Sequence, residues 1–228
     1  MHFGYLPPRQ AIAENLLINP RGKINQASEP DGTIAAGDYF CDGWKAGTSG
    51  CEVYIDADGF RLVSGSIIQL IPNNLEAARL IRTNMDIVTG SPAIKVNGRA
   101  NKALAGAGEY ITIEISGDNS KFTRVVAADS KVKPVYCQAA NELEQCQRFY
   151  FATKRNHWLH PINTSESHRR GQIELPVEMA STPAVYNIQD TYASDLKAQW
   201  ISTQGVTMMA TSTGFSMVQP GLTFDARP

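Results

Sequence analysis

Apolar and polar residues alternate with a period of two in many short segments of this chain, which is the pattern of strands that bury one face. In residues 110–115 three isoleucines alternate with Tyr, Thr and Glu, and in residues 173–179 four apolar residues alternate with Glu, Pro and Glu. The Asp-Ala-Asp-Gly turn at 56–59 joins two such segments and predicts a hairpin. Many short strands separated by Gly and Pro turns indicate an all-β fold, mainly an antiparallel β-sandwich or jelly roll.

Two segments depart from this period. In residues 142–151, Leu143, Cys146 and Tyr150 recur at helical spacing, which predicts one short central helix. Residues 75–85 also fit a helical face, so a second short helix is expected there.

The same pattern suggests three regions. Residues 1–14, which contain Pro7-Pro8, are interpreted as an N-terminal attachment arm. Residues 15–140 form an N-terminal β-sandwich region, and residues 141–228 supply the helix and the C-terminal strands. We expect the last two regions to complete one compact unit.

Composition narrows the classes of function. The chain has 228 residues, 43% of them hydrophobic, and a formal net charge of -1, which is ordinary for a globular protein with a core. Phosphate binding needs a surplus of Lys and Arg, so no nucleic-acid partner is expected. No apolar run reaches the roughly 20 residues of a membrane span, so no membrane insertion is expected. The first residues lack a secretory pattern, which favours synthesis in a cytoplasm.

The cysteines are Cys41, Cys51, Cys137 and Cys146. Their even number permits two disulfides, and Cys41 and Cys51 could lie on neighbouring strands. The length of the chain and cytoplasmic synthesis favour small buried thiols. No Cys-x-x-Cys spacing indicates a zinc or redox site.

A search for catalytic and metal-binding patterns gives no candidate. His157, His160 and His168 are close in sequence, but they lack helical patterning and an acidic partner at a characteristic offset, so we expect no metal and no cofactor. No nucleophile elbow or ordered triad is present, and we expect no enzymatic activity. Paired carboxylates for glycoside cleavage stay open, because the fold sets their separation.

Aromatic residues are the remaining candidates for ligand binding. Trp44 follows an Asp-Gly turn into a strand and is interpreted as a core residue. Trp158 lies in a polar segment that we interpret as a loop, beside Asn156, His157 and His160. Exposed loop aromatics stack on sugar rings, so these four residues are the candidate glycan-binding site.

Several motifs together resemble bacteriophage tail-fibre and receptor-binding domains. The motifs are Asn-Leu-Leu-Ile-Asn-Pro at 15–20, Ile-Asn-Gln at 24–26, Asp-Gly-Trp at 42–44, Glu-Leu-Glu-Gln-Cys-Gln-Arg-Phe-Tyr at 142–150, and Leu-Pro-Val-Glu-Met with Pro-Ala-Val at 175–185. They cover most of the chain in the order of that family. Gly43 stands where the family pattern has Arg, and Pro20 stands where it has Gly. Residues 75–108 lack the usual sandwich strands of the family.

The resemblance implies a virion protein at the tip of a tail fibre or spike, with a jelly-roll-like fold and often a homotrimeric assembly. It implies adhesion to host surface polysaccharide or lipopolysaccharide without cleavage, and contact with other virion tail proteins through the N-terminal arm. Two alternatives stay open. One is a structural virion component, such as a fibre adaptor or head decoration protein. The other is a tail-associated polysaccharide depolymerase or esterase.

Overall fold

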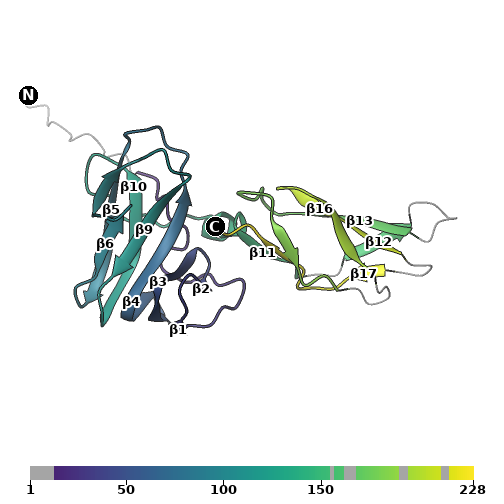
Figure 1. Ribbon diagram of the computed structural model, residues 1–228, viewed down its shortest axis with the longest axis horizontal. Coiled ribbons are helices and arrows are strands. Elements are labelled where there is room, and N and C mark those ends of the chain that lie inside the picture. The colour runs from purple at the N-terminus through teal and green to yellow at the C-terminus, as the bar shows by residue number, and fades with distance from the viewer. Residues whose placement is uncertain (1–12, 155–156, 162–167, 190–194, 212–215) are drawn as a thin grey trace, which may run out of the picture.

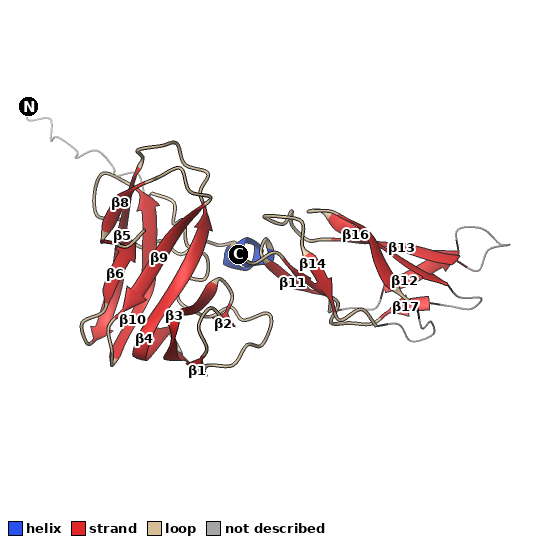
Figure 2. Cartoon of the chain, viewed as in Figure 1, coloured by secondary structure: helices blue, strands red, loops and turns tan. Residues whose placement is uncertain are grey.

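The computed structural model describes residues 13–154, 157–161, 168–189, 195–211 and 216–228. The molecule is elongated, and its two β-rich parts follow one another along the long axis (Figure 1). We call residues 13–140 the first part and residues 141–228 the second part. Strands dominate the described residues, all strand pairs are antiparallel, and the helix is short (Figure 2). The predicted all-β fold with a short central helix is therefore confirmed.

The first part is one rolled antiparallel sheet of ten strands. The strands are β1 (Gly32–Ile34), β2 (Tyr39–Cys41), β3 (Trp44–Asp56), β4 (Gly59–Pro72), β5 (Leu80–Thr89), β6 (Ala93–Val96), β7 (Arg99–Ala100), β8 (Lys102–Leu104), β9 (Tyr110–Ser116) and β10 (Ser120–Asp129). Their order is β7-β6-β9-β4-β10-β5-β8, with β3 paired to β4 and with β1 and β2 paired to β3. Strands β6 and β7 at one edge contact β5 and β8 at the other, so the sheet nearly closes on itself.

The interior of this sheet is filled by the apolar sides of the alternating strands. Ile111, Ile113 and Ile115 of β9 are all buried, as their period of two predicted. The predicted hairpin joins β3 and β4, with Asp56 opposite Gly59. Trp44 is buried as expected, and its ring centroid lies 5.2 Å from that of Phe60 in an edge-to-face contact.

The prediction of a helix in residues 75–85 is wrong. Strand β5 begins at Leu80, and its Ile81 and Thr83 are buried while Arg82 between them is only partly buried. This strand pairs with both β10 and β8, so its backbone groups are satisfied by neighbours far away in sequence. Tertiary pairing has overridden the local helical spacing. Residues 75–108 therefore contain strands β5 to β8 of the ten-stranded sheet.

The described residues of the second part form one helix and two small sheets. Helix α1 is Glu142–Gln147. A three-stranded sheet has the order β11-β18-β14, with β11 (Tyr150–Ala152), β18 (Thr223–Asp225) and β14 (Ala184–Tyr186). A five-stranded sheet has the order β15-β16-β13-β12-β17, with β15 (Lys197–Ile201), β16 (Gly205–Thr211), β13 (His168–Glu174), β12 (His157–Pro161) and β17 (Ser216–Val218).

The predicted central helix is present, but it is shorter than residues 142–151. Cys146 is fully buried, and Tyr150 is buried in strand β11 instead of the helix. Leu143 is 48% exposed, so the three residues at helical spacing do not form one buried face. A helix of six residues makes fewer than two turns, and only the side that carries Cys146 packs against the rest of the chain.

The two parts have separate hydrophobic cores. One cluster contains Trp44, Phe60 and the β9 isoleucines, and the other contains Ile173, Met208 and Phe224. In the described chain no strand of the second part joins the ten-stranded sheet. The boundary near residue 140 falls between the end of β10 at Asp129 and the start of α1 at Glu142. Residues 1–12 of the proposed arm lie outside the described residues.

All four cysteines are free thiols. Cys41, Cys51 and Cys146 are buried, in agreement with the preferred interpretation, whereas Cys137 is exposed.

Candidate functional site

Four of the five motifs of the resemblance meet in space where the two parts join. Asn19, which is buried, holds three of them with its own polar groups. Its Nδ2 donates to the carbonyl oxygens of Ile24 at 2.7 Å and Asp42 at 3.1 Å, and its Oδ1 accepts from the amide of Ile24 at 3.0 Å. Its carbonyl oxygen accepts from Nε1 of Trp44 at 2.9 Å. The Asn-Leu-Leu-Ile-Asn, Ile-Asn-Gln and Asp-Gly-Trp motifs therefore form one hydrogen-bonded unit.

Gln26 extends this unit to the second part. Its backbone amide donates to Oδ1 of Asp42 at 2.7 Å, and its Nε2 donates to Oδ2 of Asp42 at 2.6 Å and to the carbonyl oxygen of Tyr150 at 2.8 Å. Burial raises the pKa of the Asp42 carboxyl, and the hydrogen bonds from Gln26 oppose that rise. We call the contacts around Asn19, Gln26 and Asp42 the junction.

Arg227, near the C-terminal end of the chain, adds ion pairs and aromatic contacts to the junction. Its side chain is only 12% exposed and forms ion pairs with Asp225 at 2.7 Å and Glu29 at 3.0 Å. Its guanidinium carbon lies 4.4 Å from the ring centre of Tyr39 and 4.6 Å from that of Tyr150. These contacts join a residue of β2 in the first part to β11 and β18 in the second, so the junction is tied by charge as well as by hydrogen bonds.

A cleft of about 330 Å³ lies beside the junction and is lined by residues of both parts. Two of its polar side chains are already bound to backbone. Gln69 exchanges two hydrogen bonds with Ile18, and Asn15 bonds to the backbone of Val125 and Ala127. Among the described residues, Glu14 is the acidic side chain in the lining, so these residues do not place in the cleft the pair of Asp or Glu side chains that glycoside cleavage uses.

Among the described residues, no three His, Cys, Asp or Glu side chains lie close enough together to hold a metal ion. No helix in the same residues is long and apolar enough to cross a membrane.

The structure places three of the four predicted glycan-binding residues in a strand. His157, Trp158 and His160 belong to β12, so the expectation of a loop is wrong for them. The backbone of Trp158 pairs with Met217 of β17, and that of His160 pairs with Arg170 of β13. These ladders satisfy the backbone of a polar segment that has little apolar alternation of its own. Asn156 lies outside the described residues.

The sequence offered Trp200 among the aromatic residues that could stack on a sugar but did not single it out, and it lies on the same sheet. Trp200 is 65% exposed, and the guanidinium carbon of Arg170 lies 5.1 Å from its ring centre. The register of β15 against β16 shifts between Gln199 and Ile201, so Trp200 is the extra residue of a bulge. A sequence signal did exist, because Trp200 and Ile201 are adjacent and cannot both face the core of a regular strand.

The chain was compared with family models, curated proteins and solved structures. No family model matches the chain, and neither the curated proteins nor the solved structures that were searched gave a match.

Proposed function

We propose that this chain is a bacteriophage tail-fibre or spike-tip protein that adheres to host cell-surface glycans without cleaving them. The observation that carries the proposal is the convergence at the junction. Segments around residues 19, 26, 42 and 150 supplied four of the five motifs of the resemblance, and the same segments bond to one another across the two parts. A shared structural unit explains why those residue types occur together, and this supports a real relationship over a chance match of short motifs.

The architecture suits an adhesin. Antiparallel strands give a rigid scaffold, and the five-stranded sheet lies at the end of the elongated molecule away from the ten-stranded sheet (Figure 1). Such a sheet can reach a cell surface while the first part faces the virion. A homotrimer would present three copies, and linked weak sites gain affinity through effective concentration. The attachment arm would contact other virion tail proteins.

The predicted glycan contacts remain His157, Trp158 and His160 on β12, with Asn156 before them. Strand β12 pairs with β13 and β17 in the five-stranded sheet, so these contacts would lie on the outer part of the molecule. A Trp158→Ala variant that binds the glycan as tightly as the wild type would refute this choice of residues.

A glycan array that carries host polysaccharides and lipopolysaccharides tests the adhesin directly. The expected result is retention of the purified protein on a subset of glycans, with no change in the length of the bound polysaccharide. If the protein is retained on no host glycan, the adhesin proposal is wrong. If the mass of the bound polysaccharide falls during incubation, the protein is a depolymerase or esterase.

A structural virion component is the second candidate. Ile87 and Val88 are adjacent on β5 and are 54% and 62% exposed. Neighbouring exposed aliphatic side chains suit contact with another protein better than contact with a sugar. Binding of purified virion tail proteins together with no retention on glycans would favour this candidate.

A further inference from the structure

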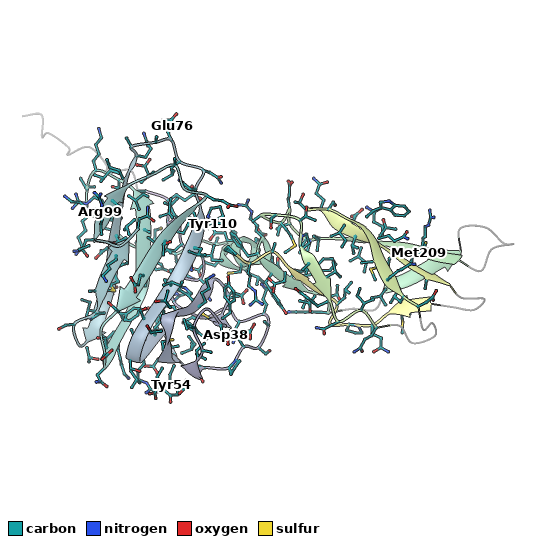
Figure 3. The ribbon with its side chains drawn as sticks, in the orientation of Figure 1. Asp38, Tyr54, Glu76, Arg99, Tyr110 and Met209 are labelled. Carbon is teal, nitrogen blue, oxygen red and sulfur yellow. The ribbon has the colours of Figure 1, made fainter. Side chains whose placement is uncertain are left out.

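Strands β13, β16 and β15 bring two cations to one row of the five-stranded sheet. Arg170 on β13 is opposite Met209 on β16, and Met209 is opposite Lys197 on β15. Residues directly opposite one another share a face of an antiparallel sheet. The flanking Met208 and Ala210 of β16 are buried in the core, so the row lies on the solvent face, where Arg170 and Lys197 are exposed. Figure 3 labels Met209 on this sheet.

Trp200 stands beside this row. The bulge in β15 releases it from the strand alternation, and the φ of Trp200 is 40°. A positive φ is costly for a bulky aromatic residue, and such strain concentrates at binding sites. Arg170 lies over the ring, while the exposed fraction of 65% leaves much of the indole surface open to a ligand.

The two cations are not neutralised by nearby acids in the structure as described. Among the described residues, neither Arg170 nor Lys197 is in an ion pair, whereas Arg227 and Arg79 each bind an acidic side chain. Two acids of the described chain lie nearby: Glu174 is opposite Gly205, four residues along β13 and therefore roughly 13 Å from Arg170, and Asp195 precedes Lys197 by two residues. Neither acid forms an ion pair with Arg170 or Lys197, so both cations stand next to an aromatic platform without an ion-pair partner among the described residues.

The ligand class follows from this combination. The C–H face of a sugar ring packs on an indole, and a guanidinium binds a carboxylate through paired hydrogen bonds. A neutral sugar would leave the cations unused. We propose that Trp200, Arg170 and Lys197 form a subsite for an acidic saccharide, in which Trp200 stacks on the ring and the cations bind its carboxylate. This inference rests on the proposed adhesin function and names its ligand class.

The test measures binding of the full chain to polygalacturonate, hyaluronate and polysialate, and to the carboxyl-reduced form of each, by titration calorimetry. The reduced polymers keep the sugar rings but have lost the charge. We expect the wild type to bind at least one acidic polymer and to bind its reduced form roughly tenfold more weakly. Binding to the acidic polymer should also weaken as salt increases.

Variants locate the subsite. Trp200→Ala and Arg170→Gln should each lower the affinity roughly three- to tenfold. The matched controls are Tyr186→Ala, another exposed aromatic residue, and Arg99→Gln, an exposed Arg of β7 in the first part. Both should bind as the wild type does. The unfolding midpoint of each variant should match that of the wild type, because the substituted side chains are exposed. This measurement shows that each variant is folded.

The outcomes separate the two proposals. If the protein is retained on neutral glycans of the array and binds no acidic polymer, the acidic subsite is wrong and the adhesin proposal stands. If an acidic polymer binds but Trp200→Ala and Arg170→Gln bind it as tightly as the wild type, the subsite is wrong in its location. If no glycan of either kind is retained, both proposals fall.

Discussion

The Nε2 group of Gln26 donates a hydrogen bond of 2.8 Å to the carbonyl oxygen of Tyr150, although 124 residues separate the two in the chain. The same Nε2 group also binds Asp42, so one amide group serves the first part and the second part together. The orientation of the second part therefore depends on a side chain within the most recognisable motifs of the sequence.

Replacement of Gln26 by Leu should lower the free energy of unfolding by about 2–3 kcal/mol, because the buried Asp42 carboxylate loses a donor and the Tyr150 carbonyl loses its partner. Chemical denaturation measures the loss. Gln138→Leu, at an exposed position, is the control and should change little. Equal stability of the Gln26 and Gln138 variants would show that the junction does not depend on Gln26.

Replacement of Arg227 by Ala should cost about 2–4 kcal/mol, because it leaves Asp225 and Glu29 unpaired in a largely enclosed site. Arg227→Lys keeps the charge but not the forked geometry, so it should recover only part of the loss. Limited proteolysis should cut the Ala variant faster between the two parts. An unchanged cleavage rate would mean that Arg227 does not hold them together.

Gly43 cannot be replaced without strain. Its φ is +79°, and an added Cβ would lie 2.6 Å from Cγ1 of Ile18. Gly43→Ala should therefore cost about 2–4 kcal/mol, and Gly43→Arg, which restores the family pattern, should be no better tolerated. Gly37→Ala is the matched control, since its φ is +81° but no atom lies within 4 Å of the added Cβ. If the Gly37 variant is as unstable as the Gly43 variant, the loss of stability comes from the positive φ alone and not from the contact with Ile18.

Thiol reagents should distinguish the cysteines. Cys137 is exposed and should react within minutes in the folded protein, while Cys41, Cys51 and Cys146 are buried and should react only after unfolding. Burial raises the pKa of Cys51 to about 11, which further slows its reaction near neutral pH. Mass spectrometry of the alkylated protein counts the modified thiols. Rapid modification of all four would contradict the buried placement.

Stability should fall at alkaline pH for the same reason. Burial raises the pKa of the Cys146 and Cys41 thiols above the ordinary value of 9.0, so the folded protein keeps protons that the unfolded chain releases. The unfolded state then binds fewer protons than the folded state, and stability is lost as pH rises above about 9, by up to about 1.4 kcal/mol per pH unit for each thiol.

Cys146→Ala should flatten this pH dependence. The free energy of unfolding of this variant and of the wild type should each be measured at pH 8 and pH 10. The change between the two pH values is then compared, because it does not contain the constant cost of the lost side chain. An identical slope in both proteins would mean that the Cys146 thiol does not titrate differently on folding.

Local patterns predicted the parts of the fold that depend on local residues. The alternation of Ile111, Ile113 and Ile115, the turn at 56–59 and the position of the short helix all follow from spacing along a few residues. Strand β5 could not be recognised, because its pairing with β10 and β8 decides its conformation against a helical spacing.

The candidate surfaces were harder to predict than the fold. Trp200 and Arg170 come from strands 30 residues apart, and a bulge in β15 decides that they meet. Spacing cannot report such a register shift. The Arg227–Glu29 pair spans 198 residues and has no local signal at either end. The motifs did mark residues that matter, because they form the junction between the two parts.

Strand β18 sets an order for folding during synthesis. It lies between β11 and β14, so that small sheet lacks its middle strand until residues 223–225 have left the ribosome. All ten strands of the first part have emerged by residue 129 and can pair earlier. Until then Phe151 and Val185 lack Phe224, the residue with which both pair in the finished sheet. A chain truncated before residue 223 would lose both ladders of that sheet and the Arg227 contacts in a single step.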